Sequence, residues 1–118
     1  MIKAVHVILY SRDPQADRAF VRDVLGWPYV DAHDGWLIFA QPPAELAFHP
    51  TDGPGHHELY LMCDDIHGTV EELTRRGAAF DGPVSEERFG LLARIRLPGG
   101  GLLGVYEPRH ASPLPAFS

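Results

Sequence analysis

Two histidines occupy the same place in a pattern that the chain uses twice. The segments HVILYSRDPQADRAFVRDVLG (residues 6–26) and HELYLMCDDIHGTVEELTRRG (57–77) both run from a histidine through alternating apolar residues to an aspartate, an amphipathic stretch and a glycine. A shift of 51 residues places His6 on His57. Imidazole is a common ligand of divalent metals, so this pairing points to metal chemistry, whereas a lone histidine in a strand more often hydrogen-bonds within a core.

Each copy of the pattern predicts a strand followed by a helix. Residues 2–10 and 57–63 alternate in the manner of strands, and the helical period then begins at residue 14 and near residue 66. Asp13 is placed to cap the first helix and Gly26 to end it. Because the period changes at the same place in both copies, the repeat predicts two modules of the same structure.

Three short strands are predicted after each helix. They span residues 29–32, 36–40 and 44–49 in the first copy, and 79–80, 91–97 and 102–107 in the second, with a charged turn at 85–88. Asp34-Gly35 and the Gly99–Gly101 run predict hairpins, while Pro42-Pro43 interrupts the first ladder. We therefore expect an α+β fold in which two tandem βαβββ modules form a curled mixed-sheet cup with helices outside. Module one covers residues 1–50, module two 56–108 and a tail 109–118 of a single domain, 1–118.

Composition bounds the possible functions. The chain has 118 residues, of which 45% are hydrophobic and 22% charged, enough for one compact domain with a real core. Cys63 is the single cysteine, which excludes an internal disulfide and a cysteine metal cluster. A net charge of −6 disfavours nucleic acid and anionic membranes as partners. With no apolar run of about 20 residues, a cytoplasmic location is expected.

These features together resemble the vicinal oxygen chelate superfamily. The resemblance is carried by the paired βαβββ modules, a histidine on the inner face of each first strand, the Asp64-Asp65-Ile66 strand ending and the Val24-Leu25-Gly26 helix ending. It extends over residues 2–108. That superfamily includes glyoxalase I, extradiol dioxygenases, fosfomycin-resistance transferases and bleomycin-resistance proteins, so the resemblance implies a fold more strongly than an activity.

The resemblance also implies a ligand set. Metal-binding members place ligands on the first and last strands of each half; His6 and His57 match the first-strand positions, and Glu45 resembles the last-strand ligand of the first half. The fourth position falls on Gly104, where metal-binding relatives carry a glutamate. This departure removes one of the four ligands expected of a glyoxalase I.

Two imidazoles and one carboxylate facing one cavity suit iron(II), and manganese, nickel or zinc are also compatible. His49, two residues beyond Glu45, is a candidate further ligand or catalytic base, and Tyr106 a candidate catalytic hydroxyl over the same cavity; the alternative for both is cavity lining. Alternation makes Glu107 point out of the cup. The remaining histidines are expected to be solvated: His33, His56, His67 and His110.

The sequence thus favours a protein that binds a small organic ligand, with a divalent-metal-dependent enzyme of the glyoxalase or dioxygenase type as the leading hypothesis. In that hypothesis a metal on His6, Glu45 and His57 acts as a Lewis acid. The alternative is a metal-free drug- or metabolite-binding protein of the bleomycin-resistance type. Exposed sheet edges in each module favour a homodimer.

Overall fold

The first half of the chain forms one helix and one hairpin. The computed structural model describes residues 1 and 3–117. Helix α1 (Pro14–Phe20) continues as a π-helical turn, η1 (Val21–Leu25). As predicted, Asp13 caps its start by accepting a hydrogen bond from the Ala16 N–H (3.1 Å), and Gly26 ends it with φ of 71°. The hairpin pairs β1 (Tyr29–Asp31) with β2 (Leu37–Phe39) through a turn in which Gly35 has φ of 86°.

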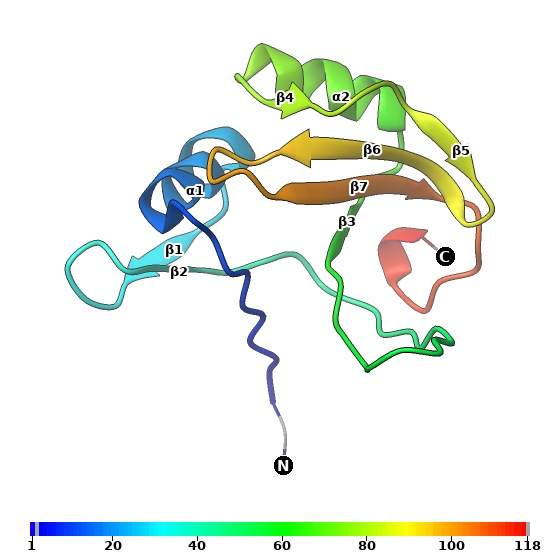
Figure 1. The fold of residues 1–118 in the computed structure, drawn as a ribbon, viewed down its shortest axis with the longest axis horizontal. Helices are drawn as coiled ribbons and strands as arrows, with labels where there is room; N and C mark the ends of the chain where they lie inside the picture. The colour runs from blue at the N-terminus through cyan, green and yellow to red at the C-terminus, as the bar shows by residue number, and fades with distance from the viewer. Residues whose placement is uncertain (2, 118) are drawn as a thin grey trace.

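The second half forms a five-stranded mixed sheet (Figure 1). Its strands are β3 (Tyr60–Met62), β4 (Ala79–Phe80), β5 (Ser85–Glu87), β6 (Gly90–Arg96) and β7 (Leu102–Pro108). The order is β3-β7-β6-β4, with β5 also paired to β6; β3 runs parallel to β7 and the other pairs are antiparallel. The segment predicted as a charged turn at 85–88 is therefore largely strand. The predicted α+β fold class with a mixed sheet is confirmed, and the sheet is open.

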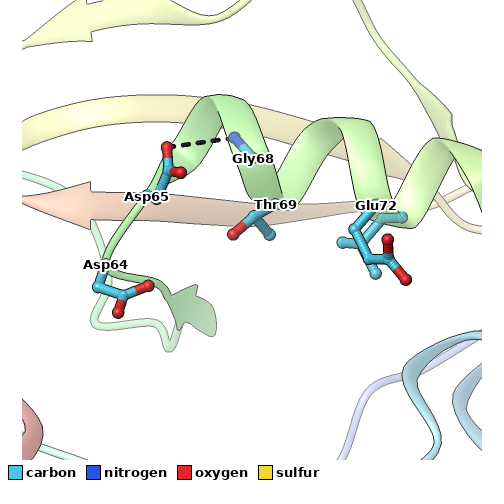
Figure 2. A pocket seen from close by; sticks show the side chains of 6 residues that line it. Asp64, Asp65, Gly68, Thr69 and Glu72 are labelled. Carbon is cyan, nitrogen blue, oxygen red and sulfur yellow. Dashed lines mark hydrogen bonds between the residues drawn. The ribbon is translucent and has the colours of Figure 1, made fainter.

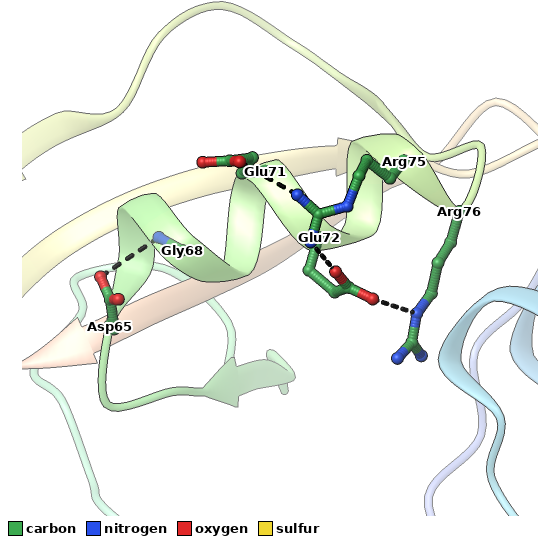
Figure 3. Close-up of polar contacts among 6 residues, drawn as sticks. All are labelled: Asp65, Gly68, Glu71, Glu72, Arg75 and Arg76. Carbon is green, nitrogen blue, oxygen red and sulfur yellow. Dashed lines mark hydrogen bonds and ion pairs between the residues drawn. The ribbon is translucent and has the colours of Figure 1, made fainter.

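Helix α2 (Ile66–Arg75) covers one face of this sheet. Asp65 caps its start through the Gly68 N–H (3.2 Å), and Glu71 and Glu72 pair with Arg75 and Arg76 along its exposed side (Figure 3). Exposed pairs of this kind contribute little stability. The Arg76 guanidinium also donates to the Val24 carbonyl in the first half (3.3 Å). The C-terminal end of α2 is thereby tied to the end of η1.

The core lies between the sheet and its helices. Ile66 of α2 and Ile95 of β6 are fully buried, and they pack with Leu103 and Val105 of β7. Phe20 of α1 belongs to the same cluster, so the first helix packs onto the second-half sheet. Alternation along β6 and β7 directs Leu92, Arg94, Gly104 and Tyr106 to the opposite face, away from α2. Among the residues that the structure describes, the helix on that side of the sheet is the short η2 (Pro115–Phe117) (Figure 1).

Two predicted strands do not form. Residues 3–10 and 44–49 have no strand pairing, and the apolar side chains of Val5, Ile8 and Phe48 are exposed at 79%, 64% and 89%; residue 2, the start of the first predicted strand, lies outside the described residues. The prediction of strands here was wrong because an alternating pattern marks a segment that can pair but supplies no partner. None of the helices in the described part of the chain has the length and apolar character needed to span a bilayer.

Candidate functional site

Three aromatic rings form one cluster on the sheet face that α2 does not cover. Tyr106 of β7 meets Phe89, which precedes β6, at 5.3 Å between ring centroids and Tyr60 of β3 at 6.0 Å, both edge to face. Tyr60 and Phe89 also contact each other at 6.2 Å. We call Tyr60, Phe89 and Tyr106 the aromatic cluster. Tyr106 is buried, whereas Tyr60 remains 41% exposed. The cluster is therefore anchored by the buried Tyr106 ring and accessible to solvent at the Tyr60 ring.

The Tyr60 ring packs directly against Gly104, which has no side chain. The register sets Tyr60 directly opposite Gly104, and a Cβ added to Gly104 would overlap the Tyr60 ring. The space for which the sequence resemblance implied a glutamate ligand is thus occupied by an aromatic side chain from the neighbouring strand. A carboxylate at residue 104 does not fit without displacing Tyr60.

A polar network joins the aromatic cluster to the C-terminal tail. The Tyr106 hydroxyl lies 2.9 Å from His110 Nε2 and 3.5 Å from Glu45 Oε1. Ser112 donates to the other Glu45 oxygen at 2.9 Å, and His110 Nδ1 lies 2.8 Å from the Ala111 carbonyl. A carbonyl only accepts, so His110 Nδ1 carries a proton and donates it to Ala111, while Nε2 faces the Tyr106 hydroxyl. The tail is thereby fastened to two predicted site residues, Glu45 and Tyr106.

Both tyrosines of the cluster remain protonated donors near neutral pH. Burial is the main cause that raises the pKa of Tyr106, and the Glu45 carboxylate adds to the rise. Burial likewise raises the pKa of Tyr60, helped by its hydrogen bond to Glu58. That bond and His56 in turn lower the pKa of Glu58. The cluster therefore presents neutral rings with two hydroxyl groups.

The predicted metal ligands are not assembled in this chain. His6 and His57 are both exposed on segments outside the strands, and His49 is exposed as well. Glu45 is mostly covered, by the tail network. In the described part of the chain, no three His, Cys, Asp or Glu side chains are grouped so that they could hold a metal ion. Glu107 points away from the open face, as predicted: its carboxylate accepts the Ile66 N–H at the start of α2 (3.1 Å).

Two surface depressions lie elsewhere. One, of about 310 Å³, sits beside the start of α2 and is lined by Asp64, Asp65 and Glu72 among others (Figure 2). Asp65 already serves there as the helix cap. The second, of about 680 Å³, lies between α1 and the β1–β2 hairpin, where Arg18 stacks 4.3 Å from the Trp36 ring centroid. Neither depression includes a predicted site residue.

Comparison with known proteins decides the family. The profile of the Glyoxalase/Bleomycin resistance protein/Dioxygenase superfamily matches residues 3–108, nearly the whole chain. The chain belongs to this superfamily. The resemblance to vicinal oxygen chelate proteins noted in the sequence is thereby confirmed. A search of curated proteins found no significant match.

Solved structures of the superfamily share this fold. TnmS3, an antibiotic binding protein from Streptomyces sp. CB03234, is 26% identical, with a TM-score of 0.60 over 92% of this chain and 99% of that one. A glyoxalase/bleomycin resistance protein/dioxygenase from Nocardioides is 17% identical (TM-score 0.65; 97% and 89% covered). Lactoylglutathione lyase from Agrobacterium tumefaciens is 23% identical (TM-score 0.60; 91% and 95% covered). Superfamily members with this fold thus include an enzyme and a binding protein.

Sequence reasoning did not select three residues that belong to the aromatic cluster and its polar network: Tyr60, Phe89 and His110. Tyr60 and Phe89 had no distinguishing signal beyond their aromatic character, and His110 was expected to be solvated. Side chains alternate between the two faces of a sheet. With the strand register known, this alternation places Tyr60 on the same face as Gly104 and Tyr106. No periodic signal in the tail could have placed His110 against Tyr106.

Proposed function

We propose that this protein binds a small, planar organic molecule against the aromatic cluster and acts as a binding or sequestering protein. The observation that carries the proposal is the aromatic cluster itself, with Gly104 leaving room for the partly exposed Tyr60 ring. Aromatic side chains with a few well-placed polar groups are typical of small-molecule sites. The hydroxyl groups of Tyr60 and Tyr106 supply the polar groups here.

The relative TnmS3 supports a binding role. It is described as an antibiotic binding protein, and this chain covers nearly its whole length at 26% identity. The description of TnmS3 does not identify the ligand of this chain, which has to be inferred from the chemistry of the aromatic cluster. A flat ring system that meets Tyr60 and Phe89 edge to face would gain about 0.5–1.5 kcal/mol per ring contact beyond the burial of its area.

Equilibrium dialysis with naphthol, a neutral planar probe, tests this function. Tyr106→Ala should weaken naphthol binding about fivefold or more, as expected for the loss of an aromatic contact. Tyr29→Ala is the matched control, because Tyr29 pairs with Phe39 in the first half, far in the fold from β7. Absence of saturable naphthol binding to the wild type, or equal weakening by both variants, would contradict the proposal.

A metal-dependent enzyme on His6, Glu45 and His57 is the second candidate. It is favoured by the equivalent positions of the two histidines in the repeat and by the extensive cover over Glu45, whose side chain is 18% exposed. The arrangement within this single chain does not fit an ion, so the hypothesis requires the histidines to move or a second copy to supply one. If it holds, His57→Ala abolishes stoichiometric iron, manganese, nickel or zinc in purified protein and His33→Ala does not. Protein that takes up none of these metals would contradict it.

A cytoplasmic homodimer completes the proposal. The exposed apolar segments 3–10 and 44–49 of the first half are the surface that we expect a second copy to cover. Light scattering should then give about twice the 13.1 kDa mass of the chain. Phe48→Asp should shift the mass to that of the monomer, because a charge in a buried apolar contact is costly. A monomeric wild type at micromolar concentration would contradict the dimer.

A further inference from the structure

Arg94 stands on the same sheet face as the aromatic cluster. It lies directly opposite Gly104 in the β6–β7 ladder, and Gly104 lies directly opposite Tyr60 in the β3–β7 ladder. The three residues therefore form one row across the sheet, with the glycine in the middle. Because Gly104 has no side chain, no Cβ stands between the Arg94 side chain and the Tyr60 ring. The Arg94 charge is close enough to act on the Tyr60 phenol.

Arg94 is half-buried, and the described part of the chain gives it no ionic partner. Among the residues that the structure describes, it makes no hydrogen bond and no ion pair. Arg96, two residues along the same strand, pairs with Asp81. A guanidinium that has lost part of its water without gaining an anion is an unusual arrangement, because arginines that leave water are generally paired.

The carboxylates near the aromatic cluster are already engaged. Glu58 accepts from the Tyr60 hydroxyl and contacts His56 at 3.2 Å. Glu87 accepts from the Ser85 hydroxyl at 3.1 Å, and Glu45 accepts from Ser112 within the tail network. Arg94 is thus a charge on this face, in the described chain, whose hydrogen-bonding capacity is unused.

We infer that Arg94 is the anion-binding residue of the ligand site, and that the ligand is a small planar aromatic carboxylate or comparable aromatic anion. This inference rests on the proposed function. The aromatic cluster holds the ring of the ligand while the planar guanidinium binds the carboxylate, a geometry in which arginine can donate two parallel hydrogen bonds. The anion also supplies the counter-charge that the described residues do not provide.

A matched set of probes tests the inference: naphthoate, neutral naphthol and cationic naphthylmethylammonium share one ring system. Titration calorimetry with the full chain should show naphthoate binding about tenfold tighter than naphthol, since a hydrogen bond to a charged group strengthens binding by that order. Arg94→Gln should remove this preference, so that naphthoate and naphthol bind with similar affinity. Arg96→Gln is the control and should leave both affinities unchanged, because Arg96 is paired with Asp81.

The outcomes separate the inference from the function on which it rests. If naphthol binds but naphthoate binds no tighter, or if Arg94→Gln keeps the preference for naphthoate, the inference is overturned and the proposed function stands. Tightest binding of the ammonium probe would show that Glu45 and Glu58 dominate the site and would also overturn it. If none of the three probes binds, the proposed function fails. A circular dichroism melt of Arg94→Gln that matches the wild type makes each result a statement about binding.

Discussion

The two halves of the molecule share one sequence pattern, but their strands pair to different extents. In the second half the first and last strands of the unit, β3 and β7, pair in parallel, and β7 also pairs with β6. In the first half the corresponding segments, residues 3–10 and 44–49, are unpaired, and only the middle hairpin β1–β2 forms. A repeated sequence pattern therefore specifies which segments are able to pair as strands. Whether they pair within one chain also depends on the loops that connect them.

The connections of the two halves differ at the point before the last strand. β6 and β7 are joined by a tight turn in which Gly100 has φ of 97°, and the Gly99 N–H is held by the Asp17 carboxylate of α1 at 2.8 Å. In the first half the corresponding connection contains Pro42-Pro43, which cannot donate to a ladder. Residues 44–49, predicted as the last strand of the first half, therefore lack a tight turn that would bring them back alongside β2.

The largest expected effect contrasts the cores of the two halves. Ile95→Ala in β6 should lower the free energy of unfolding by about 2–5 kcal/mol, because Ile95 is fully buried. Leu46→Ala, in a segment where Leu46 is 82% exposed, should cost little in the isolated chain. The proposed dimer predicts that this cost grows as protein concentration rises, because a second copy would cover Leu46. Urea unfolding at two protein concentrations measures both. A cost for Leu46→Ala that does not change with concentration would contradict the dimer.

A smaller effect is expected at Gly104. Gly104→Ala should destabilise the protein by about 1–3 kcal/mol, because the new Cβ overlaps the Tyr60 ring. Gly101→Ala is the control in the same hairpin, where the nearest side-chain atom lies 4.0 Å from the new Cβ. In a Tyr60→Ala background the cost of Gly104→Ala should fall. A cost that persists there would show that Tyr60 does not occupy the space above Gly104.

The tail network should contribute less still. Ser112→Ala removes a hydrogen bond to the partly buried Glu45 carboxylate and should cost about 1 kcal/mol in thermal or urea unfolding. Thr51→Ala is the comparison in the first half, because the Thr51 hydroxyl accepts a local hydrogen bond from the Gly53 N–H, two residues away. If both substitutions are neutral, the tail is not fastened to Glu45 in solution.

The smallest effect concerns the ionisation of Tyr60 and Tyr106. Burial raises the pKa of both above the ordinary value of about 10, so folding favours their protonated forms. Their contribution to stability is therefore complete below pH of about 10 and is lost as the pH rises through the raised values. Ultraviolet titration should show a late phenolate component that Tyr106→Phe reduces and that Tyr10→Phe, at an exposed first-half residue, leaves in place. A spectrum without that late component would contradict the burial of the cluster.

Local signals explain why most of the second half could be predicted. The N-cap position, the glycine turns and the period-two pattern set α2, β6 and β7 closely, and the same logic placed α1 and the turn at Gly35. The strands at residues 3–10 and 44–49 were predicted from the same pattern, but pairing is a tertiary property that the pattern does not contain. Glu45 and Tyr106, which the sequence placed at one cavity, do lie 3.5 Å apart, and their roles as metal ligand and catalytic hydroxyl stay predictions. The contacts of Tyr60 with Gly104 and of His110 with Tyr106 depend on strand register and on an aperiodic tail.

Mapping of a bound probe onto the backbone tests the central claim most directly. Proton–nitrogen correlation spectra of the labelled protein should be recorded during a titration with naphthol. We predict that the largest shift changes fall on Tyr60, Phe89, Leu92, Arg94, Gly104 and Tyr106, with little change along α2. Changes concentrated instead on Arg18, Tyr29 and Leu37, around the depression beside α1, would contradict a binding site at the aromatic cluster.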